Sequence, residues 1–125
     1  MTMSDSGSGA RLNYVELPTA DVVATRQFFE AAFGWSLTVF GPAYAGTVAA
    51  GAGGTSDLGL NGHGDDAPAA PLPVVEVDDL EASLAAVEAA GGVVTRPIFA
   101  FPGGRRFHFR EPSGNEMAVY VNEPG

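Results

Sequence analysis

The chain has 125 residues, 46% of them hydrophobic, and a formal net charge of −9 from 15 acidic and 6 basic residues. This length and composition predict one domain with a sizeable core, and the acidic charge argues against nucleic acid as a partner. The chain contains no cysteine and no lysine, which excludes disulfides, thiolate nucleophiles, sulfur-rich metal sites and lysine Schiff bases.

Residues 1–10 are small and polar, which predicts a disordered N-terminal tail ahead of a single domain over residues 11–123. The apolar runs that follow are short and broken by glycine or charge, so we expect no membrane partner. No basic start precedes an apolar stretch of the kind found in secretion signals. These features predict a cytoplasmic protein.

The first half of the domain has the pattern of a strand, a helix and further strands. Residues 12–17 alternate in polarity as a half-buried strand does, and Asp21 is placed to cap the helix that follows. Gly34 is placed to end that helix. The apolar residues expected to pack the helix into the core are Val22, Phe28, Phe29 and Phe33. Further strands are predicted over residues 35–40, 44–50 and 57–60.

Residues 61–71, rich in Gly, Asp, Ala and Pro, predict a linker between two halves. A strand over residues 73–77 follows, and Asp79 is placed to cap a second helix that Gly91 and Gly92 end. Leu80, Leu84 and Val87 form the core stripe of this helix.

The C-terminal segment predicts a short strand and a hairpin. The strand over residues 93–95 is expected to stop at Pro97, because proline cannot donate to a sheet ladder. Residues 99–104 are expected to form a loop. Residues 105–110 and 116–121 then form a hairpin around the turn sequence Glu-Pro-Ser-Gly-Asn.

The second half is a weak copy of the first, at a constant offset of 58 residues. The offset aligns Tyr14 with Leu72, Asp21 with Asp79, and Gly34 with Gly92. A duplicated unit predicts two sheets related by a pseudo-twofold axis, with a site made from both halves. A dimeric ferredoxin-like α+β barrel is the alternative fold, but its four strands would leave the C-terminal hairpin unexplained.

A helix that covers one face of each sheet buries the apolar side of every strand. The core side is expected to carry Val15, Leu17, Val75, Val77, Phe107, Phe109, Met117, Val119 and Val121. The opposite side would then be free to bind a ligand. The expected ligand-binding residues are Tyr14, Glu16, Leu72, Arg106, His108, Glu116, Ala118 and Tyr120, with Val74, Glu76 and Arg110 on the same side. For Glu16 and Glu116, an ion-pair network without a ligand is the alternative.

His108 is the candidate catalytic residue, since imidazole acts as a general base near neutral pH. A structural hydrogen-bond donor is the alternative role, and His63 is expected to be a surface residue. Four of the six arginines fall at Arg96, Arg105, Arg106 and Arg110. They predict either solvated strand and loop positions or a local anion site.

Three segments together resemble the vicinal oxygen chelate superfamily, which includes glyoxalase I, bleomycin-resistance proteins, fosfomycin-resistance enzymes and extradiol dioxygenases. They are residues 21–35, residues 75–92 and the ending Phe-His-Phe-Arg-Glu-Pro-Ser-Gly-Asn-Glu-Met-Ala-Val-Tyr at 107–120. The resemblance implies an α+β fold of two βαβββ modules, about 11–62 and 72–123, whose curved mixed sheets surround a cavity. It also implies a homodimer.

Metal-dependent members of that superfamily use His or Glu on the first and last strands of each module. The matching positions here are Tyr14, Leu60, Leu72 and Ala118, where Leu60 is placed only by its offset from Ala118. Leucine and alanine cannot ligate a metal, and a catalytic site needs about three protein ligands. We therefore expect no metal site and no cofactor of the usual kind.

These observations predict a protein that binds a small polar or aromatic molecule without a divalent metal, as bleomycin-resistance proteins do. Two enzymatic alternatives stay open. One is a glyoxalase-type lyase, isomerase or dioxygenase-like enzyme with a non-standard metal site of Glu16, Glu76, Glu116 and His108. The other is a metal-free enzyme with His108 as its base.

Overall fold

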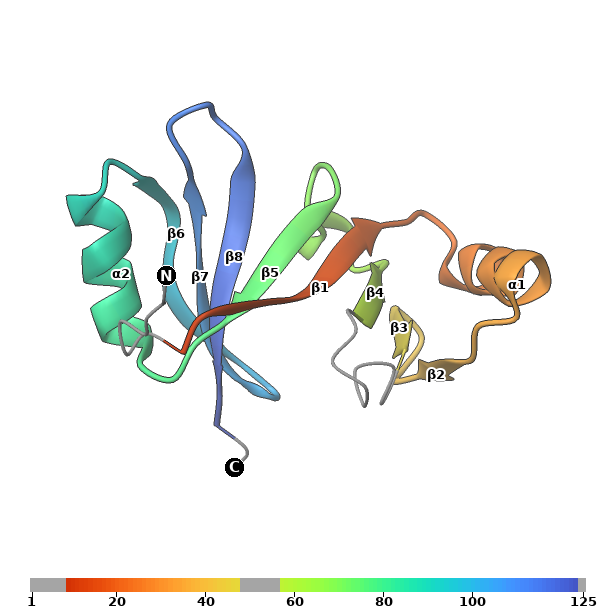
Figure 1. Ribbon diagram of the computed structural model, residues 1–125. Helices are drawn as coiled ribbons and strands as arrows, with labels where there is room; N and C mark the ends of the chain where they lie inside the picture. The colour runs from red at the N-terminus through yellow and green to blue at the C-terminus, as the bar shows by residue number, and fades with distance from the viewer. Residues whose placement is uncertain (1–8, 48–56, 124–125) are drawn as a thin grey trace. The chain divides into compact units, whose positions relative to one another are not determined.

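The computed structural model describes residues 9–47 and 57–123, and its chain divides into two compact units. The first module comprises residues 13–72, and the second comprises residues 73–125 together with residues 1–12. Figure 1 shows the helices and strands of each module. The predicted tail over residues 1–8 lies outside the described residues. No helix among the described residues combines the length and the hydropathy that a membrane span requires.

The first module has the element order βαβββ. Its elements are β1 (Arg11–Pro18), α1 (Val22–Phe33), β2 (Leu37–Val39), β3 (Tyr44–Thr47) and β4 (Asp57–Asn61), followed by a 3₁₀ turn (Gly64–Asp66). The strand order is β2-β3-β4-β1, in which β1 runs parallel to β4 and the other pairs are antiparallel. The predicted strand over residues 57–60 is thereby confirmed. The last residues of the predicted strand 44–50 lie outside the described part.

The second module repeats this order. Its elements are β5 (Leu72–Glu76), α2 (Leu80–Ala89), β6 (Val93–Phe101), β7 (Gly104–Arg110) and β8 (Glu116–Asn122). The strand order is β5-β8-β7-β6, with β5 parallel to β8 and antiparallel pairs elsewhere. Together the modules confirm the predicted α+β fold with two βαβββ units, and the predicted C-terminal hairpin is present.

Both helices begin at the aspartates that the repeat aligns. The Asp21 and Asp79 side chains accept hydrogen bonds from the backbone N–H groups of Ala24 and Ala82, each at 3.0 Å. Each carboxylate satisfies a donor that the first helical turn leaves unpaired. Gly34 ends α1 in the left-handed region with φ of 71°, which glycine adopts without steric cost. The local signals for both helices are therefore read correctly from the sequence.

In the second module, α2 packs against β6, β7 and β8 (Figure 1). The buried core consists of Val77, Leu80, Phe107, Val119 and Val121, with Val75, Leu84, Val87, Val94, Ile98 and Phe109 packed against it. This set confirms the predicted core positions Phe107, Phe109, Val119 and Val121, whereas Met117, also predicted there, is half-buried and does not belong to it. Fully burying one such side chain contributes about 1.5–3 kcal/mol, so Phe107, which is completely buried, is a principal anchor.

In the first module, α1 packs against β3 and β4 around Val22, Leu37, Ala45 and Leu60. Leu17, Leu58 and Phe29 pack against this core, as predicted for Leu17 and Phe29. Phe28 and Phe33 were also expected in the core, and this expectation is wrong, because both side chains are 59% exposed. Phe29 is the one aromatic side chain of α1 that packs against this core.

Strand β6 differs from its prediction, since it continues through Pro97 to Phe101. Its pairing with β7 shifts register between Val94 and Arg96 and again between Arg96 and Phe99. Pro97 lies in the second shift, on a strand at the edge of its module's sheet, where no ladder hydrogen bond is required of it. The predicted loop over residues 99–104 therefore shortens to a tight turn at Pro102 and Gly103.

Candidate functional site

The face of the second module's sheet opposite α2, here called the helix-free face, carries most of the predicted site residues. In the ladder between β7 and β8, Arg106 pairs with Tyr120, His108 with Ala118, and Arg110 with Glu116. Directly paired residues point to the same side of a sheet, and the alternating residues Phe107 and Val119 lie in the core. The five predicted residues Arg106, His108, Glu116, Ala118 and Tyr120 therefore share one face.

His108 is buried, with 6% of its surface exposed, and it is oriented by a carboxylate. Its Nδ1 lies 3.4 Å from Glu116 Oε2, at the long end of hydrogen-bond range. The Thr95 hydroxyl donates to the same carboxylate oxygen at 3.1 Å. His108 Nε2 is buried as well, and makes no hydrogen bond with any described residue. One imidazole nitrogen is thus held by Glu116, while the other faces the helix-free side without a protein hydrogen bond.

Burial lowers the pKa of His108 below its ordinary value, and the nearby Arg106 guanidinium lowers it further. Glu116 opposes both effects without reversing them. The imidazole is therefore neutral at pH 7. With its proton on Nδ1, towards the Glu116 carboxylate, Nε2 presents a lone pair and acts as a hydrogen-bond acceptor.

Aromatic rings and guanidinium groups surround His108. The Arg96 guanidinium lies 3.8 Å from the centroid of the Phe99 ring, and that of Arg106 lies 5.4 Å from the same centroid. Arg106 also lies 5.7 Å from the Phe101 centroid. The Phe99 ring is in turn 5.8 Å from the His108 ring. Cation–π contacts of this kind contribute about 0.5–2 kcal/mol each, so they hold the two arginines against the aromatic side chains.

Tyr120, the last of the predicted residues on β8, packs edge-on against Phe101, with 6.2 Å between the two ring centroids. The site thus gains Thr95, Arg96, Phe99 and Phe101 from β6. The sequence prediction did not assign these residues to the ligand face, because it ended the strand at Pro97. Regular alternation would have placed Arg96 on the core side with Val94 and Ile98, and the register shifts on either side of Arg96 bring it beside His108 instead.

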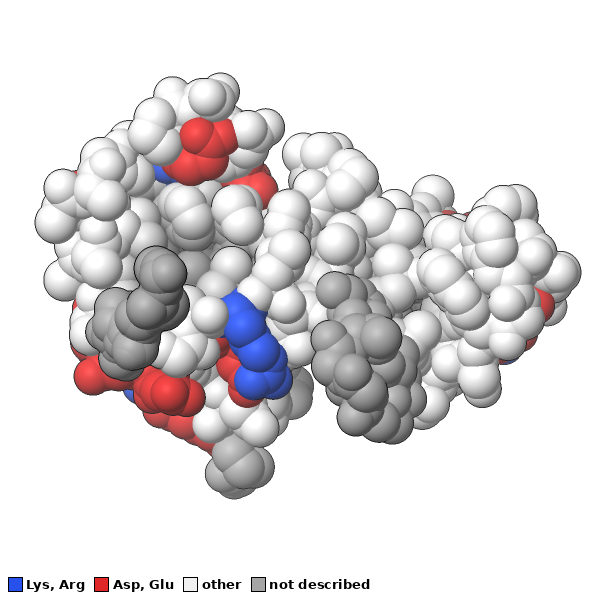
Figure 2. Space-filling model, viewed as in Figure 1, with Lys and Arg blue, Asp and Glu red and all other residues white. Residues whose placement is uncertain are grey.

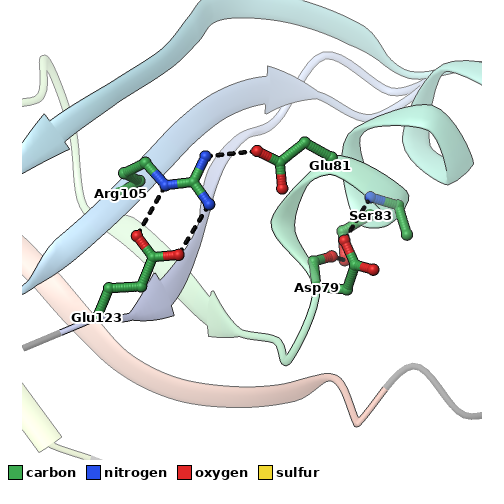
Figure 3. Close-up of polar contacts among 6 residues, drawn as sticks. Asp79, Glu81, Ser83, Arg105 and Glu123 are labelled. Carbon is green, nitrogen blue, oxygen red and sulfur yellow. Dashed lines mark hydrogen bonds and ion pairs between the residues drawn. The ribbon is translucent and has the colours of Figure 1, made fainter.

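The four clustered arginines do not form one site. Arg105 lies on the opposite side of β7 from Arg106, where its Nε donates to Glu123 at 2.8 Å and its Nη1 donates to Glu81 (Figure 3). These contacts lower the pKa of both glutamates. Arg110 donates to the backbone carbonyl of Gly114 at 2.9 Å. Only Arg96 and Arg106 therefore adjoin the aromatic residues of the helix-free face.

The first module carries a different set of polar residues. Glu16 is buried, and Asn61 Nδ2 donates to its carboxylate at 2.9 Å. Asn61 Oδ1 accepts the backbone N–H of His63 at 2.9 Å, and the His63 side chain is exposed as predicted. Here the amide of Asn61, which the sequence analysis did not single out, satisfies one Glu16 oxygen and orients the carboxylate.

The strand pairing corrects the position that the repeat assigned to Leu60. Gly59 pairs with Glu16 in the first module, as Ala118 pairs with Val74 in the second. The sequence separation between Glu16 and Gly59 is one residue shorter than that between Val74 and Ala118. The offset between equivalent positions of the two modules therefore grows from 58 to 59 in this strand. Leu60 consequently lies in the core beneath α1, and Gly59 is the true counterpart of Ala118.

Gly59 also has no room for a side chain. A Cβ atom at this position would lie 2.1 Å from the Tyr44 hydroxyl oxygen and 3.6 Å from the Tyr14 ring. Tyr14 and Tyr44 therefore approach the sheet closely at the position where the second module has a methyl group. Of the other predicted residues, Tyr14 and Glu16 lie on one side of β1, and Leu72 is buried at the start of β5.

The residues at the four strand positions do not fit a divalent metal. With the corrected register they are Tyr14, Gly59, Leu72 and Ala118, and the Tyr14 phenol supplies the one side-chain donor among them. Across residues 9–47 and 57–123, the His, Asp and Glu side chains form no group of three or more that could hold a metal ion. Glu76, proposed as an unconventional ligand, pairs with Arg11 instead.

Comparison with known proteins gives one family. Residues 11–119 match the model of the Glyoxalase/Bleomycin resistance protein/Dioxygenase superfamily. The search of curated proteins gives no match.

Solved structures give the same fold. A superfamily member from Vibrio splendidus 12B01 is 16% identical with a TM-score of 0.69, covering 90% of this chain and 99% of that one. Methylmalonyl-CoA epimerase from Mycobacterium tuberculosis is 14% identical with a TM-score of 0.67, covering 98% and 94%. The Mn(II)-bound glyoxalase from Novosphingobium aromaticivorans is 24% identical with a TM-score of 0.65, covering 92% of this chain but 40% of that one. At these identities the similarity establishes the fold alone.

Proposed function

We propose that this chain, which belongs to the Glyoxalase/Bleomycin resistance protein/Dioxygenase superfamily, binds a small polar or aromatic molecule without the usual divalent metal. The proposed ligand lies against the helix-free face of the second module. The observation that carries the proposal is the buried His108 Nε2, which has no hydrogen-bond partner among the described residues. An unsatisfied buried polar atom costs about 1–3 kcal/mol, and a ligand donor would remove that cost.

The surroundings of His108 indicate the chemistry of the ligand. A neutral Nε2 accepts a hydrogen bond, so the ligand is expected to present a hydroxyl or N–H group there. Phe99 and Phe101 offer ring faces to a planar molecule, and the guanidinium groups of Arg96 and Arg106 favour a polar or anionic substituent. The ligand therefore combines a flat apolar part with at least one donor group.

The donor set supports binding without a metal. A phenol, a glycine, a leucine and an alanine stand where metal-dependent members carry His or Glu, and three protein ligands are the usual minimum. The test is metal analysis of untagged protein by mass spectrometry. We expect no stoichiometric Zn, Ni, Mn or Fe, and one equivalent of any of these that survives dialysis would overturn the metal-free proposal.

Ligand binding is tested by native mass spectrometry of the purified protein, followed by calorimetric titration with the molecule that copurifies. The chain has two histidines, which supply a matched pair of variants. His108→Gln is expected to weaken binding at least tenfold, because the amide misplaces the acceptor. His63→Gln, at an exposed position, is expected to leave binding unchanged. Equal affinities of the two variants would remove His108 from the site.

One arrangement favours a second function, a metal-free lyase or isomerase with His108 as the general base. Glu116, itself bonded to Thr95, faces Nδ1 and would stabilise the imidazolium formed when Nε2 takes a proton. Turnover of the copurified ligand that is lost in His108→Ala even at ligand concentrations that saturate the variant would support catalysis. Turnover retained in His108→Ala would eliminate this second function.

A further inference from the structure

The paired strands arrange the side chains of the helix-free face in two adjacent rows. The first row crosses the sheet of the second module through Val74, Ala118, His108 and Arg96. The second row, two residues away on β5, β7 and β8, crosses it through Glu76, Tyr120, Arg106 and Phe99. Two residues of a strand span about 7 Å, a length that one aromatic ring with two opposite substituents can bridge. A single small molecule can therefore reach both His108 and Arg106.

The helix-free face is positively charged, although the chain as a whole is acidic. Among the described residues, its charged side chains are four arginines and two glutamates, namely Arg11, Arg96, Arg106, Arg110, Glu76 and Glu116. Arg11 belongs to this set because it pairs with Glu76. The local formal charge is thus +2 on a chain of −9. In the view of Figure 2, acidic atoms cover more of the second module than basic atoms do. Charges more than about 8 Å away are largely screened at physiological ionic strength, so the local charge favours an anion at the helix-free face.

Arg106 is the arginine best placed to bind that anion. It is buried, with 8% of its surface exposed, and its guanidinium lies within 6 Å of the ring centroids of both Phe99 and Phe101. A guanidinium carries five N–H donors in a fixed planar fork, which matches the two oxygens of a carboxylate. Burial strengthens such a pair, because less water competes for the same donors. A carboxylate, planar like the guanidinium and the neighbouring rings, therefore suits this position better than a tetrahedral phosphate.

The opposite end of the ligand meets His108, whose Nε2 accepts a hydrogen bond from a hydroxyl or N–H group. The side chains next to His108 in its row, Ala118 and Val74, are apolar and completely buried, so they offer the ligand no further polar group. On the basis of the function proposed above, we infer that the ligand is an aromatic carboxylic acid with a hydroxyl or N–H group opposite the acid, and that Arg106 selects for the carboxylate.

The first test is calorimetric titration of the wild type with three probes of one ring each. They are para-hydroxybenzoate, its uncharged amide para-hydroxybenzamide, and benzoate, which lacks the donor group. We expect para-hydroxybenzoate to bind at least about tenfold more tightly than either other probe, because a hydrogen bond to a charged group is the stronger one and an unsatisfied Nε2 is costly. Equal affinities for the acid and its amide, or no binding of the acid, would overturn the assignment of the ligand class.

The second test repeats these titrations with variants whose fold is checked by circular dichroism. Arg106→Gln is expected to bind the acid and the amide equally, since it lacks both the charge and the fork. Arg106→Lys keeps the charge without the fork and should retain part of the preference for the acid, and it carries the comparison if Arg106→Gln does not fold. The matched control is Arg105→Gln, on the opposite side of β7, which should retain the full preference. An Arg106 variant that prefers the acid as strongly as the wild type does would overturn the role of Arg106.

The identity of the copurified ligand separates the ligand class from the proposed function. A neutral or cationic molecule whose binding depends on His108 would overturn the aromatic acid and leave the proposed function standing. A molecule whose binding does not depend on His108 would overturn both. An aromatic acid that Arg106→Gln binds at least about tenfold more weakly, and that Arg105→Gln binds as the wild type does, would support both.

Discussion

The two modules share a backbone plan and differ in what their side chains do. Both begin with a strand, cap the following helix with an aspartate and return through three strands. On the sheet face away from the helix, the first module buries a Glu16–Asn61 pair and packs two tyrosines at Gly59. The second module places a neutral histidine among arginines and phenylalanines on the corresponding face. One module thus carries a histidine suited to ligand chemistry, while the other carries exposed aromatic residues on its helix.

This difference teaches that the duplicated features are those the backbone needs. Caps, glycine stops and apolar side chains that pack each helix on its sheet recur because unpaired helix ends and uncovered sheets are costly in any copy. Side chains beyond these requirements diverge. The following predictions test this division between common scaffold and module-specific residues, from the largest expected effect to the smallest.

Removing a core phenylalanine should destabilise the protein more than removing an exposed phenylalanine. Phe107→Ala is expected to lower the free energy of unfolding by about 3–5 kcal/mol, because it empties a fully buried position. Phe28→Ala is expected to change it by at most about 0.5 kcal/mol under conditions where the protein is monomeric, because its ring is largely exposed. Urea denaturation followed by circular dichroism measures both. Similar losses for the two variants would show that Phe28 belongs to the core.

The glycine of the first module should not accept the alanine of the second. Gly59→Ala is expected to destabilise the protein by about 1–3 kcal/mol, because its Cβ would overlap the Tyr44 hydroxyl. Removing that hydroxyl with Tyr44→Phe should recover part of the loss. A double-mutant cycle from urea denaturation measures the coupling. Additive effects would contradict the close approach of Tyr44 to Gly59.

The two helix caps should be equivalent and independent. Asp21→Ala and Asp79→Ala are each expected to cost about 1 kcal/mol, since each removes one hydrogen bond to the first helical turn. The double variant should lose the sum, because the two caps belong to different modules. Thermal unfolding measures all three variants, with Asp→Asn at either position as a control that preserves the capping oxygen. If removing one cap left the thermal stability unchanged, the two helices would not be equivalent.

The pH dependence of the free energy of unfolding should include a contribution from His108. The pKa of His108 is lowered in the fold, so the unfolded chain binds a proton more readily than the folded chain does. Above a pH of about 6.5, His108 therefore does not lower the free energy of unfolding. As the pH falls from there towards the lowered pKa of the folded state, protonation of the unfolded chain reduces that free energy. NMR titration of the imidazole signals should find His108 protonated at a lower pH in the folded protein than in the unfolded chain. Stability at low pH is then compared in the two variants. The contribution of His108 is the part of the stability loss that disappears in His108→Gln but persists in His63→Gln. A pKa of His108 higher in the folded protein than in the unfolded chain would contradict its neutral state.

Much of the site was predictable because alternation along a strand is a local property. The period of two along residues 105–110 and 116–121 correctly separated Phe107 and Val119 from Arg106, His108 and Tyr120. It could not reveal that Thr95 and Glu116 orient His108, since that contact joins strands 21 residues apart in sequence. The ligand-binding role of these residues stays a prediction.

By itself, the sequence determined the duplication, the two capped helices, the core side of each strand in the hairpin and the family. These features depend on hydrogen bonds and side-chain periods within a few residues, which the residues themselves encode. Only the tertiary structure decided that β6 passes through Pro97, that Gly59 rather than Leu60 matches Ala118, and that Phe28 and Phe33 remain outside the core. Strand register and the space beneath a helix are set by neighbours far away in the chain, so no local pattern contains them.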